Sequence, residues 1–266
     1  MKLFVREQGS ESGAAIGASI PLVLLHGLFG SADNLGMLAR GLEDTRRIIS
    51  LDLRNHGRSP HASAMSYPLM AADVLETLDG MGVDAAFFYG HSMGGKTAMQ
   101  IALSAPERVA GLMLGDIAPV RYAAHHDKII EGMMAVAFAA PQARDEAELM
   151  LSAYVTEPAV LSFLMTNWRR QAGGYGWRVN LEAIARQYEQ IAAAPGGTPY
   201  GGPALFIKGG LSDYITAAYR DVILQLFPVA EVRIIEGGGH WFHAEKTAMT
   251  LRIIRRFLEA GIRPAG

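Results

Sequence analysis

The feature that most constrains this chain is a serine, Ser92, placed between an apolar run and a segment of helical character. The apolar run covers 85–89, the sequence Gly90-His91-Ser92-Met93-Gly94 follows it, and the helical segment covers 96–105. A G-x-S-x-G sequence between a strand and a helix predicts a nucleophile elbow, a tight turn that holds the serine hydroxyl above a sheet. Side chains at the flanking glycines would strike the neighbouring strand and helix. The motif therefore indicates acyl transfer through a covalent serine intermediate.

The length and composition fit one α/β domain, or one domain that carries an insertion. The chain has 266 residues, and a chain of this size buries about 70–75% of its unfolded surface, so it needs no metal or disulfide support. It contains no cysteine, which excludes a disulfide framework, a Cys-ligated metal and a thiol nucleophile. A net charge of −2 gives no electrostatic reason to bind nucleic acid or an anionic membrane.

The N-terminus predicts neither secretion nor a membrane anchor. Only three apolar residues, 3–5, precede Arg6 and Glu7, which is too short for the apolar region of a signal peptide. No uninterrupted apolar stretch approaches the roughly 20 residues of a membrane helix. We therefore expect a cytoplasmic protein with no membrane partner.

Apolar runs alternate with amphipathic segments along most of the chain. We expect strands over 2–6, 21–25, 47–51, 85–89, 110–115, 204–208 and 231–235, and helices over 33–42, 66–81, 96–105 and 245–258. The small-residue stretch 9–19 is interpreted as a loose hairpin connection. Such alternation predicts a mostly parallel sheet with helices on both faces.

One long segment interrupts this alternation and predicts an inserted helical lid. Between 121 and 199 there is no convincing strand, but helical stretches cover 126–139, 145–154, 159–171 and 181–193. Helices inserted between two strands would lie over the carboxyl ends of the strands, where α/β sheets bind ligands. We therefore expect a core domain formed by 1–120 and 200–266, with a cap domain over 121–199.

A serine nucleophile needs a base, and His240 is the best placed of eight histidines. It follows Gly237-Gly238-Gly239, a flexible approach that lets a loop fold back over the sheet edge. Hydrolases with this elbow place nucleophile, acid and histidine in that chain order. The other candidates are interpreted as structural or peripheral: His26 and His56 in turns, His61 in a loop, His125 and His126 at the lid entrance, and His243 on the following helix. No further ligand cluster accompanies His240 and His243, so we expect no metal.

Two aspartates compete as the residue that orients the base. Asp116 ends the expected strand over 110–115, and Asp213 follows the next strand. Adjacent strands lie about 4.8 Å apart, so a loop at either strand end could reach a histidine that arches across them. The residues themselves do not choose between the two.

The oxyanion formed during acyl transfer requires N–H donors. One is expected from Met93, the residue after the nucleophile, and the second from Leu28 in the loop after the strand over 21–25. Ser92 also lies at the start of a helix, whose N-terminal partial positive charge favours a developing anion.

Together these motifs resemble the α/β-hydrolase superfamily. The resemblance rests on His26-Gly27-Leu28-Phe29-Gly30-Ser31, on Asp52-Leu53-Arg54-Asn55-His56-Gly57-Arg58-Ser59, on the elbow and on Gly239-His240. The segments Gly30-Ser31-Ala32-Asp33-Asn34, Gly94-Gly95-Lys96, Asp116-Ile117-Ala118-Pro119 and Gly239-His240-Trp241 resemble small bacterial serine esterases of the YbfF type. The resemblance implies the α/β-hydrolase fold, with a mostly parallel eight-stranded sheet and an inserted helical lid.

The same resemblance implies an activity and favours one acid. In the YbfF-type branch the acid lies in the D-I-A-P segment, which implies Asp116, whereas most other members of the superfamily use the position of Asp213. It further implies hydrolysis of small-molecule carboxylic esters or of acyl thioesters such as acyl-CoA, without a cofactor. Ser92 would attack the acyl carbon while His240 takes its proton.

Other functions share this fold, because fold does not fix function. C–C bond hydrolases, perhydrolases and lyases use the same three residue types, and a more distant alternative is a ligand-binding protein that resembles a hydrolase. Dehalogenases and epoxide hydrolases usually carry aspartate at the elbow, so Ser92 argues against both.

Overall fold

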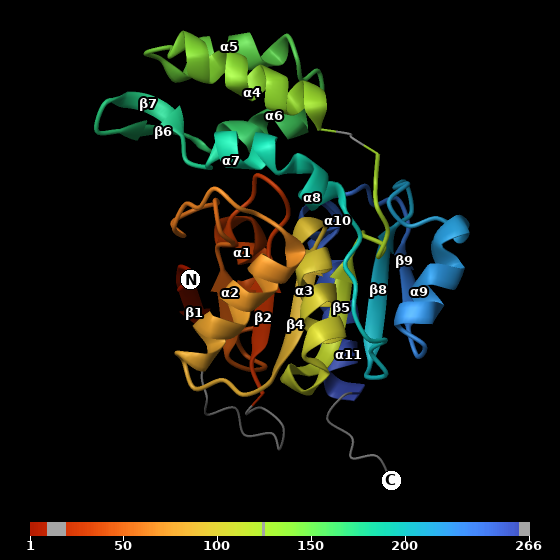
Figure 1. Cartoon of the computed structure of the whole chain (residues 1–266). Helices are drawn as coiled ribbons and strands as arrows, with labels where there is room; N and C mark the ends of the chain where they lie inside the picture. Colours follow the sequence, from red (N-terminus) through yellow and green to blue (C-terminus); the bar gives the residue numbers. More distant parts are fainter. Residues whose placement is uncertain (10–19, 124–125, 261–266) are drawn as a thin grey trace.

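A seven-stranded sheet forms the centre of the structure (Figure 1). This computed structural model describes residues 1–9, 20–123 and 126–260. The strand order is β1-β3-β2-β4-β5-β8-β9, and the strands are β1 Val5–Gln8, β2 Leu22–Leu25, β3 Ile48–Leu51, β4 Ala86–His91, β5 Val109–Gly115, β8 Ala204–Gly209 and β9 Glu231–Ile235. β1 runs antiparallel to β3, and the other pairings are parallel.

Each of the seven expected strands is present, but the first begins at Val5 rather than at Lys2, and the sheet differs from the expected eight strands. Over the described residues, seven strands pair in the main sheet. The hairpin connection expected over 9–19 lies, except for Gly9, outside the described residues. All residues of β2, β3 and β4 are buried, as expected for parallel strands covered on both faces.

Helices cover both faces of the sheet. Alternate residues of each strand point to opposite faces, so both faces present apolar side chains on which helices pack. Val23, Leu25 and Phe88 pack with helices α2 (Tyr67–Asp79) and α3 (Met93–Ser104) in one apolar core. Leu22, Leu24 and Phe87 belong to the second core, on the opposite face. That face is covered by α1 (Gly36–Arg40), α10 (Phe242–Glu245) and α11 (Thr247–Ala260), while α9 (Arg220–Leu226) lies near β8 and β9 (Figure 1).

The helix limits follow local backbone chemistry. Pro68 lies in the first turn of α2, where its missing N–H leaves no helical hydrogen bond unmade, and Gly80 follows the last turn. The elbow helix α3 ends at Ser104, two residues before Pro106, as the sequence predicts. Among the described residues, no helix is both long and apolar enough to cross a membrane.

Residues 126–192, between β5 and β8, form a separate layer, which we call the cap segment. It contains α4 Asp127–Ala139, α5 Arg144–Ser152, α6 Pro158–Met165, β6 Trp168–Gln171, β7 Gly174–Trp177, α7 Leu181–Arg186 and α8 Tyr188–Ala192. Figure 1 shows this layer above the end of the sheet at which α3 begins, with α8 close to α3. The cap segment therefore lies over the elbow.

Two expectations for this segment are wrong. The helix expected over 159–171 ends at Met165, and Trp168–Gln171 pairs with Gly174–Trp177 as an antiparallel hairpin with a two-residue turn. Gly174 has a φ of +128°, which favours glycine and allows the tight reversal. The helix expected over 181–193 divides at Gln187 into α7 and α8.

The tryptophans explain why the hairpin is stable. Trp168 and Trp177 are directly paired across the two strands, and their rings lie 4.9 Å apart in an edge-to-face arrangement, a favourable aromatic geometry. The Trp177 indole N–H donates to the Met133 carbonyl oxygen of α4 at 2.8 Å. The hairpin is thus anchored to the helical part of the cap segment.

Candidate active site

Ser92 lies at a sharp turn between β4 and α3. Its φ is +53°, a region that non-glycine residues rarely occupy and that is typical of strained functional turns. A Cβ on Gly90 would lie 2.2 Å from the Gly94 carbonyl oxygen, and one on Gly94 would lie 2.2 Å from the Leu25 carbonyl oxygen. The expectation that both glycines are required by close backbone packing is therefore confirmed.

Asp116 and His240 are brought together from distant parts of the chain. Asp116 directly follows β5 and is fully buried. The His240 Nδ1–H donates to Asp116 Oδ2 at 2.8 Å. The Gly209 N–H donates to Asp116 Oδ1 at 2.9 Å, and the Ser212 hydroxyl donates to Oδ2. A buried carboxylate needs such hydrogen bonds to offset its loss of hydration, and this one accepts three.

Asp213, the competing candidate, lies in a different environment. Its side chain is exposed in the turn after β8, and it makes no hydrogen bond or ion pair with His240 within the described residues. The residues on either side of Asp213 in the chain do contact the site. Ser212 donates to Asp116, and the Tyr214 ring stacks on the His240 ring with centroids 4.0 Å apart.

Further contacts fix the position of His240. The ring of His91 lies 4.7 Å from the ring of His240, and the His91 Nε2–H donates to the His240 carbonyl oxygen at 2.8 Å. Burial lowers the pKa of His91, and the nearby His243 and His240 act in the same direction. Since His91 stays neutral, it can hold the His240 backbone without adding charge to the site.

Ser92 opens onto two cavities that meet at its side chain. The larger, of about 890 Å³, is lined by both Ser92 and His240, together with apolar residues such as Phe163 and Trp241. The smaller, of about 390 Å³, is lined by Ser92 but not by His240. Among the described contacts, the Ser92 hydroxyl forms no hydrogen bond with His240; catalytic hydrogen bonds often tighten only when substrate binds.

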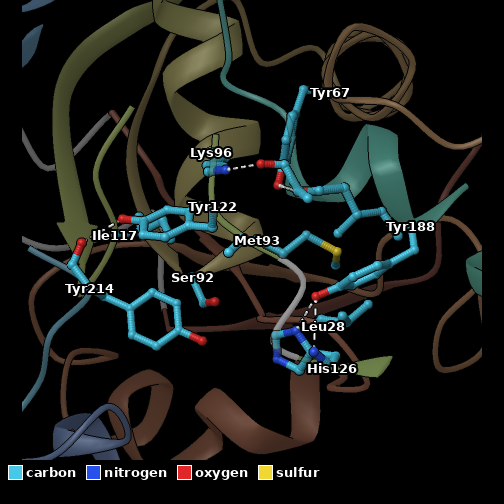
Figure 2. Close-up of a pocket in the computed structure, with 13 residues that line it drawn as sticks. Leu28, Tyr67, Ser92, Met93, Lys96, Ile117, Tyr122, His126, Tyr188 and Tyr214 are labelled. Atoms are coloured by element: carbon cyan, nitrogen blue, oxygen red, sulfur yellow. Dashed lines mark hydrogen bonds between the residues drawn. The ribbon is translucent and has the colours of Figure 1, made fainter. Parts of the chain in front are cut away.

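Tyrosines and a buried lysine surround the smaller cavity (Figure 2). Lys96 lies one turn after Ser92 on α3, and its Nζ donates to the carbonyl oxygens of Ala192 at 3.1 Å and Ala193 at 2.7 Å. Its ammonium also lies 4.7 Å from the centre of the Tyr122 ring. Burial lowers the pKa of Lys96 to about 7, and the charge of Arg121 adds to this shift. Lys96 thus ties the end of the cap segment to the elbow helix.

The loop after β2, residues 26–30, forms a tight turn beside the nucleophile. The Gly30 N–H donates to the Gly27 carbonyl oxygen at 2.9 Å, and Phe29 has a φ of +60°. Leu28 lines both cavities next to Ser92. In the described part of the chain, neither the Leu28 nor the Met93 N–H donates to a protein acceptor. Both groups remain available for a substrate oxygen.

Two buried neutral histidines support this turn. His26 Nε2 accepts from the Leu53 N–H at 2.9 Å, and His56 Nε2 accepts from the Phe29 N–H at 3.1 Å. Burial lowers the pKa of His26 to about 4 and that of His56 to about 3. Their expected structural positions agree with these contacts. His125 lies outside the described residues, and His126 contacts Tyr188 and Phe29 and lines both cavities beside Ser92.

Ser212, Tyr214 and Lys96 were missed by sequence reasoning. The position of Lys96 near the site could have been predicted, because residues four apart on a helix share a face and Ser92 lies four positions before Lys96. For Ser212 and Tyr214 the sequence gives no indication of a role in the site beyond their position next to Asp213. Among the residues the structure describes, no group of three or more metal-binding side chains could hold a metal ion.

Comparison with known proteins agrees with the fold and the elbow. A family model for the alpha/beta hydrolase fold matches residues 20–247. The chain belongs to this family. The resemblance on which the sequence analysis relied is therefore confirmed.

Similar proteins include bacterial and vertebrate members of this family. Esterase YbfF of Escherichia coli strain K12 is 42% identical over 259 residues, which cover 97% of this chain and 99% of that protein. The sn-1-specific diacylglycerol lipase ABHD11 of Xenopus tropicalis is 42% identical over 253 residues, with coverage of 90% and 78%. A solved marine microorganism esterase superposes with a TM-score of 0.91 at 38% identity, with coverage of 97% and 99%.

Proposed function

We propose that this chain hydrolyses carboxylic esters through an acyl-enzyme intermediate, with Ser92 as nucleophile, His240 as base and Asp116 as the residue that orients the base. The observation that carries the proposal is the 2.8 Å hydrogen bond from His240 Nδ1–H to the buried Asp116 carboxylate, in a site where His240 and Ser92 line one cavity. The names of the similar proteins, esterase and lipase, support the same reaction class.

The hydrogen bond to Asp116 determines how His240 works. Since Nδ1 carries the proton that Asp116 accepts, Nε2 is free to take the proton of the Ser92 hydroxyl. The Ser92 Oγ then bonds to the acyl carbon, and the carbon–oxygen bond to the alcohol breaks as His240 returns the proton to the alcohol. A water molecule then attacks the acyl carbon while His240 takes its proton. The bond between the acyl carbon and Ser92 Oγ breaks as His240 returns the proton to Oγ, which releases the carboxylic acid and restores the Ser92 hydroxyl.

The Leu28 and Met93 N–H groups complete this mechanism as the oxyanion hole. Neither has a protein acceptor in the described part of the chain, and both residues line the smaller cavity beside Ser92. One donor of this kind typically contributes about 3–4 kcal/mol to transition-state stabilisation. The start of α3 adds its partial positive charge at Ser92.

We assign the acyl group to the smaller cavity and the leaving group to the larger one. The leaving group must receive its proton from His240, and His240 lines only the larger cavity. The larger cavity offers more room for a bulky alcohol, or for a thiol such as that of coenzyme A, and His240 in its wall can protonate either leaving group. In this proposal, 1–120 and 200–266 form the core domain, and 121–199 is the cap that closes both cavities. A cytoplasmic location stays a prediction.

A panel of p-nitrophenyl esters and acyl-CoA thioesters tests the proposal. With a fixed leaving group, kcat/KM should fall by about tenfold or more once the acyl chain outgrows the smaller cavity, the size of effect that a misfitting methylene produces. With a fixed acetyl group, larger alcohols should be tolerated. Ser92→Ala should abolish all of these activities. Ester hydrolysis that persists in Ser92→Ala would refute the proposed mechanism.

A further inference from the structure

Phe29 stands out in the turn that carries the Leu28 N–H. Its φ of +60° is uncommon for a large side chain, which adopts this region only when its surroundings hold it there. The peptide groups on either side of Phe29 determine how the 27–30 turn is oriented. The Leu28 N–H belongs to the adjoining Gly27–Leu28 peptide group, so contacts made by those two groups constrain where it points.

Both peptide groups of Phe29 are held by buried side chains from different parts of the fold. The Phe29 N–H donates to His56 Nε2 at 3.1 Å, and His56 belongs to the turn after β3. The Phe29 carbonyl oxygen accepts from Asn167 Nδ2 at 2.7 Å, and Asn167 lies in the cap segment between α6 and β6. His56 and Asn167 are 0% and 3% exposed, so water does not replace either contact.

Asn167 is itself fixed within the cap segment. Its N–H donates to the Leu164 carbonyl oxygen at 2.9 Å, and its carbonyl oxygen accepts from the Arg178 N–H at 2.8 Å. Its backbone is thus bound to the cap on both sides, while its amide group reaches the core at Phe29. Its side chain thus provides a hydrogen bond from the cap segment to the turn beside Ser92, where the Phe29 ring also lies 6.3 Å from the His126 ring of the cap segment.

We propose that Asn167 is a positioning residue that makes the oxyanion hole depend on the seating of the cap. This inference rests on the proposed function and deepens it. With Asn167 in place, Phe29 keeps its left-handed conformation and the Leu28 N–H faces the substrate oxygen. When the cap is displaced or the amide is lost, the buried carbonyl of Phe29 has no donor, and the turn relaxes to satisfy it.

Asn167→Asp is the most direct perturbation because it keeps the shape of the side chain but replaces the donor by an acceptor. Asn180→Asp is the matched control. Asn180 Nδ2 also joins the cap to the core, by donating to Asn55 Oδ1 at 3.1 Å, but it does not contact the 27–30 turn. Its Oδ1 accepts from the Ala183 N–H, a contact that aspartate retains.

We expect Asn167→Asp to lower kcat by about 10–100-fold, part of the loss that follows removal of an entire oxyanion donor. KM should change by less than about threefold, because the cavity side chains are unaffected. The inhibition constant of a trifluoromethyl ketone, which places an oxyanion in the hole, should rise in parallel with the loss of kcat/KM. Asn180→Asp should leave kcat and this inhibition constant within about twofold of wild type.

Equal losses of kcat in the two variants would overturn the inference, as would a trifluoromethyl ketone affinity that Asn167→Asp leaves unchanged. If Asn167→Asp does not unfold cooperatively, Asn167→Ala replaces it with the same expected split between kcat and KM. An inactive wild-type protein would instead count against the proposed function. The two failures are thus distinguishable.

Discussion

At the scale of single residues, the site depends on how one carboxylate is buried. Asp116 is fully buried and accepts hydrogen bonds from Gly209, Ser212 and His240. Burying a charged group is costly unless its hydrogen bonds are made, and the last residue of β8 and the loop after it supply two of these donors. This arrangement leaves one direction for the imidazole, with Nδ1 towards Asp116 and Nε2 towards the cavity.

Replacement of this carboxylate should mainly affect catalysis. Asp116→Asn keeps the shape of the side chain but its amide favours the wrong tautomer of His240, so kcat should fall by about 10³–10⁴-fold. Asp213→Asn, in the next loop, should retain kcat within about twofold. Steady-state kinetics on a p-nitrophenyl ester compares the two variants, and a large loss confined to Asp213→Asn would show that the acid has been assigned to the wrong residue.

At the scale of secondary structure, the core strands and the first two helices of the cap segment were predictable from sequence, whereas the hairpin of the cap segment was not. Strands such as Leu22–Leu25 are apolar at every position, a local signal that needs no tertiary context. The elbow was also predictable. Its turn has no room for a Cβ at Gly90 or Gly94, so it requires glycine at both positions and leaves a recognisable motif in the sequence. In the cap segment, Trp168 continues the apolar helical spacing of α6, and only the pairing of Trp168–Gln171 with Gly174–Trp177 makes this segment a strand.

The choice of acid shows the same limit for the site. Ser92 and His240 belong to sequence motifs, so the residues next to each of them in the chain are enough to identify it. Asp116 and Asp213 follow adjacent strands, β5 and β8, so strand spacing gives both a similar reach. What separates their environments is the path of the chain at the end of β8 and in the loop after it, which turns the Gly209 N–H and the Ser212 hydroxyl towards Asp116. Loop paths of this kind depend on tertiary contacts that the motif does not encode.

At the scale of the whole molecule, several buried histidines that stay neutral make stability depend on pH. Burial lowers the pKa of His26 to about 4, of His56 to about 3 and of His243 to about 4. In the unfolded chain a histidine binds a proton below about pH 6.5. Between that value and the native pKa, the unfolded state holds more protons than the native state, so the free energy of unfolding falls as the pH decreases.

His243 allows this linkage to be measured. Its Nδ1 is buried without a hydrogen-bond partner in the described structure, so His243→Leu removes the ring without breaking a hydrogen bond at Nδ1. As the pH decreases, the free energy of unfolding from urea titrations should fall less steeply in this variant, by about 1 kcal/mol per pH unit between about pH 4.5 and 6. Identical pH slopes in the two proteins would mean that His243 does not stay neutral when buried.

The central claim, that Ser92 is the residue made nucleophilic by His240 and Asp116, is tested most directly by covalent labelling. A fluorophosphonate is incubated with the protein, and peptides are analysed by mass spectrometry. One phosphonyl group should be found on the peptide that contains Ser92, its appearance should parallel the loss of esterase activity, and Ser92→Ala should remain unlabelled. A protein that hydrolyses esters while Ser92 stays unmodified, or that carries the label on another residue, would contradict the mechanism.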